Sequence, residues 1–410
     1  MTQEASDFRD EAGAMGPLAG VRVVDVGQLV QAPQAAQMLG DMGADVIKVE
    51  LPGIGDAARW IALTDEDRRS AFFIGCNRGK RGITIDLRKP EGREVFLRLI
   101  ERADIVTSNF TAGTLDGWGV GYEDLSARNP RVILAQGNVF GPLGPDAHRE
   151  GADLAGQASG GLVRRMATRD ADDLTPVSVT IADHLGSQNM VAGVLAALHA
   201  RERTGRGQKV EVSLLGGQLF AQASEYTWAG LTGQDPPPAD QGHPLIPPVY
   251  GVFPTADDHI AFLGSPLGRN AAFFEAIGHP EFADDPKYAD CVIWPKHRKE
   301  ILERYTEIFR TKTTDEWVEI FAKHQFRYAR VRSYSEVIAD DGVYENGYLQ
   351  KVLHPEWGEV TLPGSPVRFS ETPANPGQQA PELGQHTEEI LLETGLAWEE
   401  IESLKKTGAV

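Results

Sequence analysis

Residues 21–50 read VRVVDVGQLVQAPQAAQMLGDMGADVIKVE, and this stretch decides the fold. Residues 21–26 form a β-branched run after a glycine, which is typical of a strand. Residues 33–42 have a helical pattern that Gly43 ends, and residues 44–50 form a second strand-like run. A strand, a helix and a strand within about thirty residues predict a βαβ unit, and therefore a parallel sheet.

The same alternation continues over the first 140 residues. Residues 82–87 and 103–107 have the composition of strands, a helical pattern at 90–102 separates them, and a further strand is expected at 131–135. Because strands alternate with helices, we expect a doubly wound sheet with helices on both faces. The predicted fold class is α/β, with a large domain built on a parallel sheet.

Changes in composition predict where the domains end. Prolines gather at 236–248, residues 250–263 then have the pattern of a β-hairpin, and helical patterns follow. This order predicts a second, smaller α+β domain. In chain order we predict a mobile N-terminal tail at 1–16, a large α/β domain at 17–225, a proline-rich linker at 226–248, a small domain at 249–340, and a return linker at 341–410 whose final helix, 387–394, packs on the large domain.

Composition narrows the classes of function. The formal net charge is −19, which disfavours nucleic acid and anionic membranes as partners. Two cysteines, Cys76 and Cys291, make no disulfide framework, so a reducing cytoplasm is the expected location. Residues 1–16 lack the apolar segment of a secretory signal, and no apolar run has the length of a membrane span. Zinc-site, P-loop and dinucleotide-loop motifs do not occur, so we expect no bound metal.

Asp183 lies in TIADHLG, residues 180–186, where an apolar helical pattern begins. Aspartate is a common N-cap residue, because its side chain accepts hydrogen bonds from the unpaired N–H groups of a first helical turn. The same surroundings keep a carboxylate ionised and oriented, and such a carboxylate is a competent nucleophile. The residues by themselves leave both roles open.

Two segments flank this aspartate in the sequence. GADLAGQASGG at 151–161 precedes it, and RTGRGQKVEVS at 203–213 follows it. With Asp183 between them, this order resembles the class III CoA-transferase family, of the formyl-CoA and carnitine-CoA transferase type. The resemblance covers residues 18–396. Further segments that match the family in order are 43–50, 129–133, 204–208 and 362–368.

The resemblance implies an activity and its substrates. The matching aspartate of the family takes an acyl group from a CoA thioester, which implies that Asp183 forms a mixed anhydride and then an aspartyl-CoA thioester. A free carboxylic acid is then the second substrate. CoA enters only as a substrate thioester, with no tightly bound cofactor. Family members further imply an interlocked homodimer in which the large domain, 17–225, binds CoA.

Two neighbouring positions bear on the reaction. Asp153 matches an acidic family position near the nucleophile, so we expect it to be the second catalytic residue, although an isolated acid also suits a solvated loop. A sister branch, the α-methylacyl-CoA racemases, carries a histidine where this chain has Ala152. His148 or His184 could replace that acid–base group. An acyl-CoA racemase or epimerase that uses Asp183 as acid and base therefore stays an alternative, and a non-catalytic CoA-binding protein is a second one.

The resemblance also implies where CoA binds. The family's turn after the first strand corresponds to 27–33, and the cation-rich turn 77–81 could grip phosphates or simply be solvated. Leu51 and Gly117 occupy two positions where the family has arginines, which motivates the non-catalytic alternative. The expected CoA contacts are Val30, Gln31, Arg59, Asn77, Lys80, Arg81, Asn109 and Phe110.

The run QGHPLIPP at 241–248 replaces a glycine run of the formyl-CoA transferases. It is apolar and rich in proline, and Tyr226, Trp228 and Tyr250 lie near it in sequence. We expect from this difference an acyl group that is bulkier than a small, highly polar acid such as oxalate.

Overall fold

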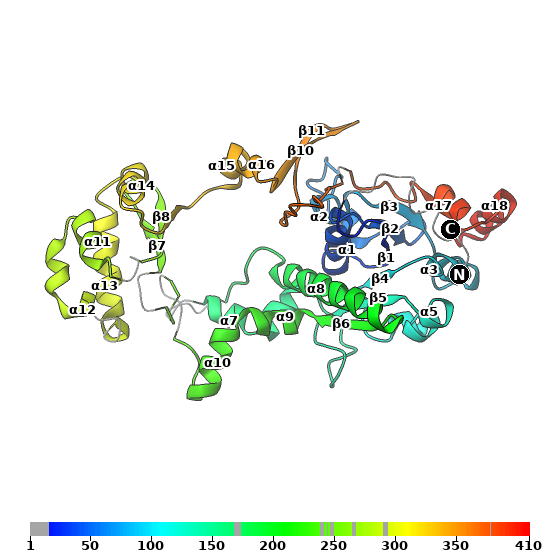
Figure 1. Ribbon diagram of the computed structural model, residues 1–410, viewed down its shortest axis with the longest axis horizontal. Helices are drawn as coiled ribbons and strands as arrows, with labels where there is room; N and C mark the ends of the chain where they lie inside the picture. The colour runs from blue at the N-terminus through cyan, green and yellow to red at the C-terminus, as the bar shows by residue number, and fades with distance from the viewer. Residues whose placement is uncertain are drawn as a thin grey trace. The chain divides into compact units, whose positions relative to one another are not determined.

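Figure 1 shows the computed structural model of the chain. The structure describes residues 16–167, 174–237, 242–243, 245–246, 250–264, 268–289, 294–377 and 379–410. These described residues form two compact units, the first from those within 1–162, 177–221 and 341–410, and the second from those within 163–176 and 222–340. Among the described residues, none of the helices is long and apolar enough to cross a lipid bilayer.

The division into units differs in detail from the predicted domain boundaries. The chain returns to the first unit at Asp341, where the return linker was expected, whereas Val163–Pro176 groups with the second unit. The expected tail at 1–16 lies outside the described residues except for Gly16, and so does most of 238–249.

A parallel sheet of six strands forms the centre of the first unit, in the order β3-β2-β1-β4-β5-β6. Every neighbouring pair in it is parallel. The predicted α/β fold with a doubly wound parallel sheet is confirmed, and the strand order reverses between β1 and β4, where such folds bind ligands. The strands are β1 (Arg22–Asp25), β2 (Asp45–Glu50), β3 (Arg81–Thr84), β4 (Ile105–Ser108), β5 (Ile133–Asn138) and β6 (Lys209–Ser213).

Helices cover both faces of this sheet, because successive strand residues point to opposite sides. Val23 packs in the cluster under α1 and α8, whereas Val24 packs in the cluster under α3, α5, α17 and α18. The last two helices, red in Figure 1, therefore belong to the core of the first unit. The sequence analysis predicted α17 but not α18. These helices are α1 (Gln31–Asp41), α3 (Pro90–Ile100), α5 (Tyr122–Arg128), α8 (Ile181–Thr204), α17 (Thr387–Glu393) and α18 (Trp398–Thr407).

Shorter elements complete the first unit. An antiparallel hairpin, β10 (Leu349–His354) and β11 (Gly358–Pro363), occupies part of the segment that was predicted to be a return linker. The short helices are η2 (Ala57–Trp60), α2 (Ala71–Asn77), α4 (Thr114–Gly117), α6 (Asp153–Ser159), α9 (Leu214–Ala221) and α16 (Asp341–Glu345), and α7 (Leu162–Met166) lies at the boundary between the units.

The second unit has its own small sheet and an aromatic core. Its strands are β7 (Gly251–Pro254), β8 (His259–Phe262) and β9 (Tyr328–Arg330), and they pair antiparallel, as predicted for the hairpin of the first two. Phe262, Phe309 and Trp317 are among the fully buried side chains of the core. The helices are α10 (Ala223–Thr232), α11 (Asn270–Ala276), η3 (Pro280–Asp284), α12 (Pro286–Ala289), α13 (Trp294–Phe309), α14 (Thr314–Lys323) and α15 (Tyr334–Ile338).

Candidate active site

Asp183 lies in the first turn of α8. The helix begins at Ile181, and its N-cap residue is Thr180, whose side chain makes no capping hydrogen bond. Asp183 is therefore the third helical residue, and the N-cap role that the sequence left open for it does not apply. Its carboxyl group lies at the positive end of the α8 dipole, close to the chain that enters the helix.

Asp153 caps this helix from a different element. It is the first residue of α6 and is buried. Its Oδ1 accepts hydrogen bonds from the backbone N–H groups of Ala182 at 2.7 Å and Asp183 at 3.2 Å. The structure thus brings the two predicted catalytic carboxyl groups together, and it gives Asp153 the role of anchoring the turn that carries Asp183.

The two carboxyl groups are in different environments. Burial raises the pKa of Asp183 to about 7, and the negative charge of Asp153 adds to this effect. Neighbouring carboxyl groups whose surroundings separate their behaviour are a common basis of acid, base and nucleophile roles in enzymes. At neutral pH Asp183 is consequently divided between its acid and carboxylate forms, and its carboxylate is more basic than an ordinary one.

His184 follows Asp183, but both of its ring nitrogens have partners. Nδ1 lies 2.6 Å from Oε1 of Gln34, and Nε2 lies 3.2 Å from Oγ1 of Thr180. Burial lowers the pKa of its imidazole. The other candidate for a second acid–base group, His148, is exposed, with Nδ1 3.0 Å from the carbonyl oxygen of Ala112. Neither histidine stands out as the partner base that the racemase alternative needs.

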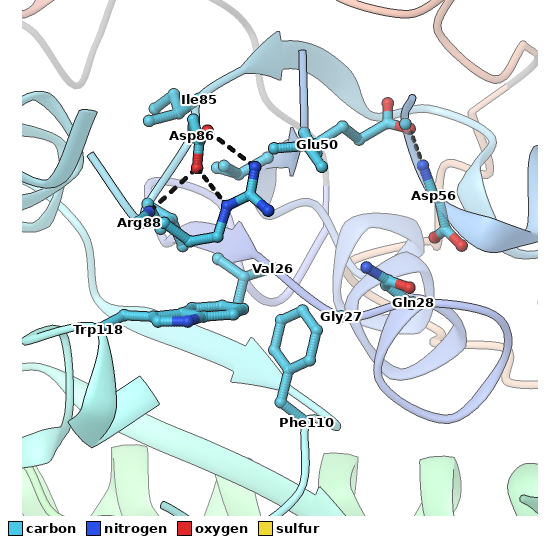
Figure 2. Close-up of a pocket in the computed structure, with 14 residues that line it drawn as sticks. Val26, Gly27, Gln28, Glu50, Asp56, Ile85, Asp86, Arg88, Phe110 and Trp118 are labelled. Atoms are coloured by element: carbon cyan, nitrogen blue, oxygen red, sulfur yellow. Dashed lines mark hydrogen bonds and ion pairs between the residues drawn. The ribbon is translucent and has the colours of Figure 1, made fainter. Parts of the chain in front are cut away.

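A pocket of about 250 Å³ lies at the carboxyl ends of β1 to β3 and beside the segment after β4 (Figure 2). This is the edge of the sheet and the side of the switch point at which doubly wound folds bind nucleotides. The lining residues are Val26, Gly27, Gln28, Val49, Glu50, Leu51, Gly55, Asp56, Ile85, Asp86, Leu87, Arg88, Phe110 and Trp118.

Two aromatic rings form one wall of the pocket. The rings of Phe110 and Trp118 meet edge to face, with centroids 5.0 Å apart, and Figure 2 shows both beside Val26. Aromatic surfaces at such a site can stack on a nucleobase. Phe110 was expected from the sequence because it follows the end of a strand, whereas Trp118 was missed. Trp118 lies eight positions further along the chain, too far from the strand end to be expected there.

Arg88 is the cation that lines this pocket, and the sequence analysis missed it. Its side chain is 59% exposed and donates to Asp86 through Nε and Nη2 at 2.8 and 2.9 Å. Leu51 lines the same pocket, and Gly117 faces open space. Arg88 thus supplies a positive charge to the pocket that Leu51 also lines. Its position just after the strand β3 is the feature of the sequence that could have identified it.

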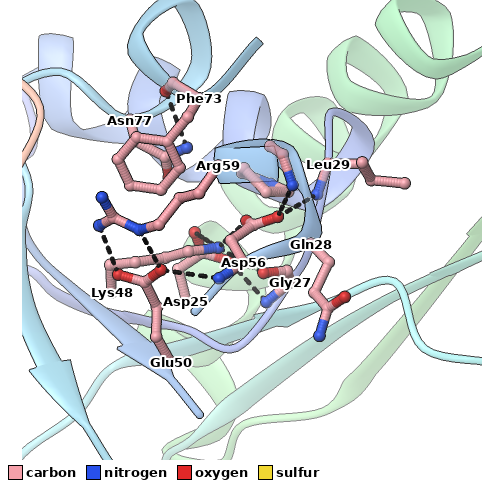
Figure 3. Close-up of polar contacts among 12 residues, drawn as sticks. Asp25, Gly27, Gln28, Leu29, Lys48, Glu50, Asp56, Arg59, Phe73 and Asn77 are labelled. Atoms are coloured by element: carbon pink, nitrogen blue, oxygen red, sulfur yellow. Dashed lines mark hydrogen bonds and ion pairs between the residues drawn. The ribbon is translucent and has the colours of Figure 1, made fainter. Parts of the chain in front are cut away.

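The loop after β1 is held by side chains from several elements (Figure 3). Asn109 bonds both backbone groups of Gln28, each at 2.8 Å, and Oδ1 of Asp56 accepts from the N–H of Leu29 at 2.9 Å. Leu29 has a positive φ of 62°, a conformation that a non-glycine residue keeps only when its surroundings impose it. Asn109 therefore shapes the loop beside the pocket.

Lys80 and Asn77 lie in a buried ionic network beneath that loop. Nζ of Lys80 donates to Asp25 Oδ2 at 2.8 Å, to the carbonyl oxygen of Pro33 at 2.8 Å and to Asn77 Oδ1 at 2.7 Å. Lys48 pairs with Asp56 at 2.8 Å in the same network. Burial lowers the pKa of Lys80 to about 8 despite the charge of Asp25. These two predicted phosphate contacts are thus used inside the protein.

The arginines of the predicted set also pair with protein groups. Arg59 donates to both oxygens of Glu50 at 2.8 Å, and its guanidinium lies 3.6 Å above the Phe73 ring, as Figure 3 shows. Arg81 pairs with Asp45, and with Glu393 at the surface. The structure therefore does not gather Arg59, Arg81, Lys80 and Asn77 at the pocket.

Neither Val30 nor Gln31 lines the pocket, and Gln31 packs against α8. Val30 is buried at the N-cap position of α1. A Cβ atom added at Gly137 or Gly186 would lie 2.2 or 2.5 Å from the carboxamide of Gln31, so glycine at both positions lets this buried side chain lie here without shifting. Ser187 Oγ joins the two helices by hydrogen bonds to the carbonyl oxygens of Gln31 and Asp183, at 2.7 and 2.9 Å.

Two further expectations concern metal binding and the run 241–248. Within the part of the chain that the structure describes, no group of three or more histidine, cysteine or acidic side chains could hold a metal ion. The run 241–248, which was expected to disfavour small polar acids, lies mostly outside the described residues.

The comparisons with known proteins point to one family. The model of CoA-transferase family III matches residues 18–387. The chain is 33% identical to the succinyl-CoA:mesaconate CoA-transferase of Haloarcula hispanica, covering 93% of this chain and 97% of that protein. It is 31% identical to the succinyl-CoA:glutarate CoA-transferase of Mus musculus, covering 98% and 92%.

A solved structure supports the same assignment. A CAIB/BAIF family protein from Brucella suis superposes with a TM-score of 0.81 at 30% identity, and the match covers 93% of this chain and 100% of that one. The chain belongs to CoA-transferase family III and is a CoA-transferase that acts on CoA thioesters.

Proposed function

We propose that this protein moves CoA from an acyl-CoA thioester to a free carboxylic acid through covalent intermediates on Asp183. The observation that carries the proposal is the partly buried Asp183 carboxyl group, whose pKa is raised to about 7, in a helical turn that Asp153 anchors. A basic, fixed carboxylate is the nucleophile that this exchange requires.

The reaction proceeds in balanced steps. A carboxylate oxygen of Asp183 attacks the acyl carbonyl carbon, the carbon–sulfur bond breaks, and CoA leaves as a thiolate. The thiolate attacks the aspartyl carbonyl carbon of the mixed anhydride and releases the donor acid as a carboxylate. The acceptor carboxylate then attacks the aspartyl-CoA thioester, and the expelled thiolate takes the acceptor acyl group from the second anhydride. Asp183 is regenerated, and no proton or electron is consumed.

Asp153 is proposed to position the nucleophile. Its Oδ1 is used by the N–H groups of Ala182 and Asp183, so this oxygen is engaged in holding the turn. Its charge also keeps the Asp183 carboxylate basic. A carboxylate that is both held in place and basic attacks a thioester faster than a mobile surface acid does.

We propose that the CoA nucleotide occupies the pocket at the ends of β1 to β3. Phe110 and Trp118 offer aromatic surface to the adenine, and Arg88 offers a charge to a phosphate. Gln28 lines this pocket, and Gln31, three positions further, packs against the helix of Asp183. The loop therefore runs from the pocket to the nucleophile, and the pantetheine arm is proposed to follow it.

The substrate pair is proposed to consist of dicarboxylic acids. The two curated relatives described above are named for succinyl-CoA with mesaconate or glutarate. This favours succinyl-CoA as donor and a five-carbon dicarboxylate as acceptor over the formyl-CoA type that the resemblance first implied. A panel of CoA thioesters against free acids, followed by chromatography of the CoA products, decides between them.

The covalent intermediate is tested by trapping. The protein is incubated with succinyl-CoA and hydroxylamine, digested, and analysed by mass spectrometry. A hydroxamate on the peptide that contains Asp183, and none with the Asp183→Asn variant, is the expected result. Exchange of the α-proton with deuterated water in the absence of an acceptor acid, without a trapped adduct, would instead support the racemase.

The active species is proposed to be a homodimer, as the family resemblance implies. Light scattering of the purified protein at micromolar concentration should give twice the mass of 44.6 kDa. A monomeric mass with full transfer activity would contradict this part of the proposal.

A further inference from the structure

We infer that Gln157 is a positioning residue, which acts through Asp153 to fix the turn that carries Asp183. The inference rests on the proposed role of Asp183 as nucleophile. Gln157 lies in the segment 151–161 that precedes Asp183 in the sequence, and no step of the proposed reaction uses it.

The carboxamide of Gln157 is buried, with 1% of the residue exposed, and it has a partner on each side. Nε2 lies 2.6 Å from Oδ2 of Asp153, 3.2 Å from the carbonyl oxygen of Val177 and 3.3 Å from that of Val179. Oε1 accepts from the N–H of Val177 at 3.0 Å. A buried amide with this many partners is costly to move, because each lost bond leaves a polar group unsatisfied.

Gln157 and Asp153 lie four positions apart in α6 and so share one face of that helix. Together they hold the chain that enters α8 at two places. Gln157 makes hydrogen bonds to the backbone of Val177 and Val179. Asp153 accepts hydrogen bonds from the backbone N–H groups of Ala182 and Asp183. Helix α6 thereby fixes the position of the nucleophile.

Helix α6 also packs closely against α8, which makes this arrangement rigid. A Cβ atom added at Gly156 would lie 3.0 Å from Cβ of Ala182 and 2.8 Å from Cβ of Leu214. The backbone of α6 therefore approaches α8 and α9 directly beside Gln157. Since packed interiors transmit small shifts, a change at Gln157 is expected to reach Asp183.

A neutral amide suits this task better than an acid. Both oxygens of Asp153 are in use, Oδ1 by the N–H groups of α8 and Oδ2 by Nε2 of Gln157. A glutamate at 157 would have the same size but no N–H group, and its charge would oppose that of Asp153. The required feature is therefore the donor on Nε2.

The test compares Gln157→Leu with the unmodified protein in the acylation half-reaction, in which CoA release from succinyl-CoA is followed by a thiol reagent. Acylation kcat should fall by about tenfold to a hundredfold, as expected for a misplaced nucleophile, while KM stays within about twofold. If the Leu variant does not fold, Gln157→Glu at pH 8 removes the same donor without changing the size. A variant that folds and keeps the unmodified kcat would overturn the inference.

A double-variant cycle separates action through Asp153 from a general loss of packing. If Gln157 acts through Asp153, the Asp153→Asn, Gln157→Leu protein should have nearly the kcat of the slower single variant. If the losses of kcat in the two single variants multiply in the double variant, Gln157 does not act through Asp153 and the inference is overturned. Gln37→Leu is the matched control: Gln37 is also buried and bridges Gly75 and Arg78, at 3.0 and 2.9 Å, so it should lower the melting temperature without lowering kcat.

Hydrogen exchange keeps this test independent of the reaction. The amides of Val177, Ala182 and Asp183 donate to the two side chains and should exchange faster in Gln157→Leu than in the unmodified protein. Unchanged exchange rates would show that Gln157 does not hold this segment, and would overturn the inference even if Asp183 is the nucleophile. Failure to trap an adduct in the unmodified protein would instead refute the proposed function and leave this readout intact.

Discussion

Replacing Asp183 by asparagine should stabilise the folded protein, and the gain should depend on pH. The unfolded chain loses the Asp183 proton near the ordinary pKa of 3.8, whereas burial and the charge of Asp153 raise the pKa in the folded protein to about 7. Between these two values the folded protein binds more protons than the unfolded chain. Its stability therefore falls as the pH rises through this window.

The size of the effect follows from the two pKa values. Each pKa unit corresponds to about 1.4 kcal/mol, so a rise from 3.8 to about 7 corresponds to at most about 4 kcal/mol. The penalty is nearly absent at pH 4 and complete at about pH 8. Asparagine has no such proton, so Asp183→Asn should be more stable by a few kcal/mol at pH 8 and about equal to the unmodified protein at pH 4.

Urea denaturation at intervals from pH 4 to pH 8.5 measures this difference, with tryptophan fluorescence as the probe and equal m-values as the condition for comparison. Asp284→Asn is a matched control, because Asp284 is exposed and a surface substitution changes stability by no more than about 0.5 kcal/mol. A stability difference that stays constant with pH, or that favours the unmodified protein above pH 7, would refute the account of the Asp183 environment.

Three further predictions concern activity and binding. The rate constant kcat/KM for acylation should rise with pH and reach half its maximum near pH 7, since only the Asp183 carboxylate attacks; a flat profile from pH 5 to 9 contradicts this. Trp118→Ala should weaken CoA binding in calorimetry by about fivefold to a hundredfold through lost stacking, with no change if the nucleotide binds elsewhere. Lys80→Met should lower stability by about 1–3 kcal/mol, because Asp25 loses this partner but keeps Lys48 at 3.5 Å, yet leave the KM of the folded fraction unchanged; a raised KM would restore Lys80 as a CoA contact.

The parallel sheet could be predicted because its signals are local. Residues 21–26 and 44–50 carry valine or isoleucine at successive positions, which face opposite sides of a strand, and the helix between them has its own period, so neither signal depends on distant contacts. Asp183 could be placed for a similar reason, since the segments around it have a fixed order. The hairpin β10–β11 and helix α18 were missed because most of their residues are exposed or half-buried, so the apolar pattern that marks an element is weak.

The CoA contacts show where sequence reasoning ended. Lys80 and Arg88 are both cations next to β3, and nothing in their neighbours distinguishes them. The fold places Lys80 beneath the loop with Asp25, whereas it leaves Arg88 more than half exposed at the pocket. A charged side chain takes its role from the groups around it, and residues far away in sequence bring those groups.

The α/β fold, the family and the aspartate at the start of α8 could all be inferred from short contiguous stretches, because their signals are local. The tertiary structure decided which helix caps α8, since Asp153 lies thirty positions before Asp183 and reaches its N–H only after α6 packs against α8. It also decided the pKa of Asp183, because burial and a neighbouring charge are properties of the folded chain. The periodicity of apolar residues is a local property of the sequence, whereas the burial of a side chain and its pairing with other groups arise only when distant segments meet.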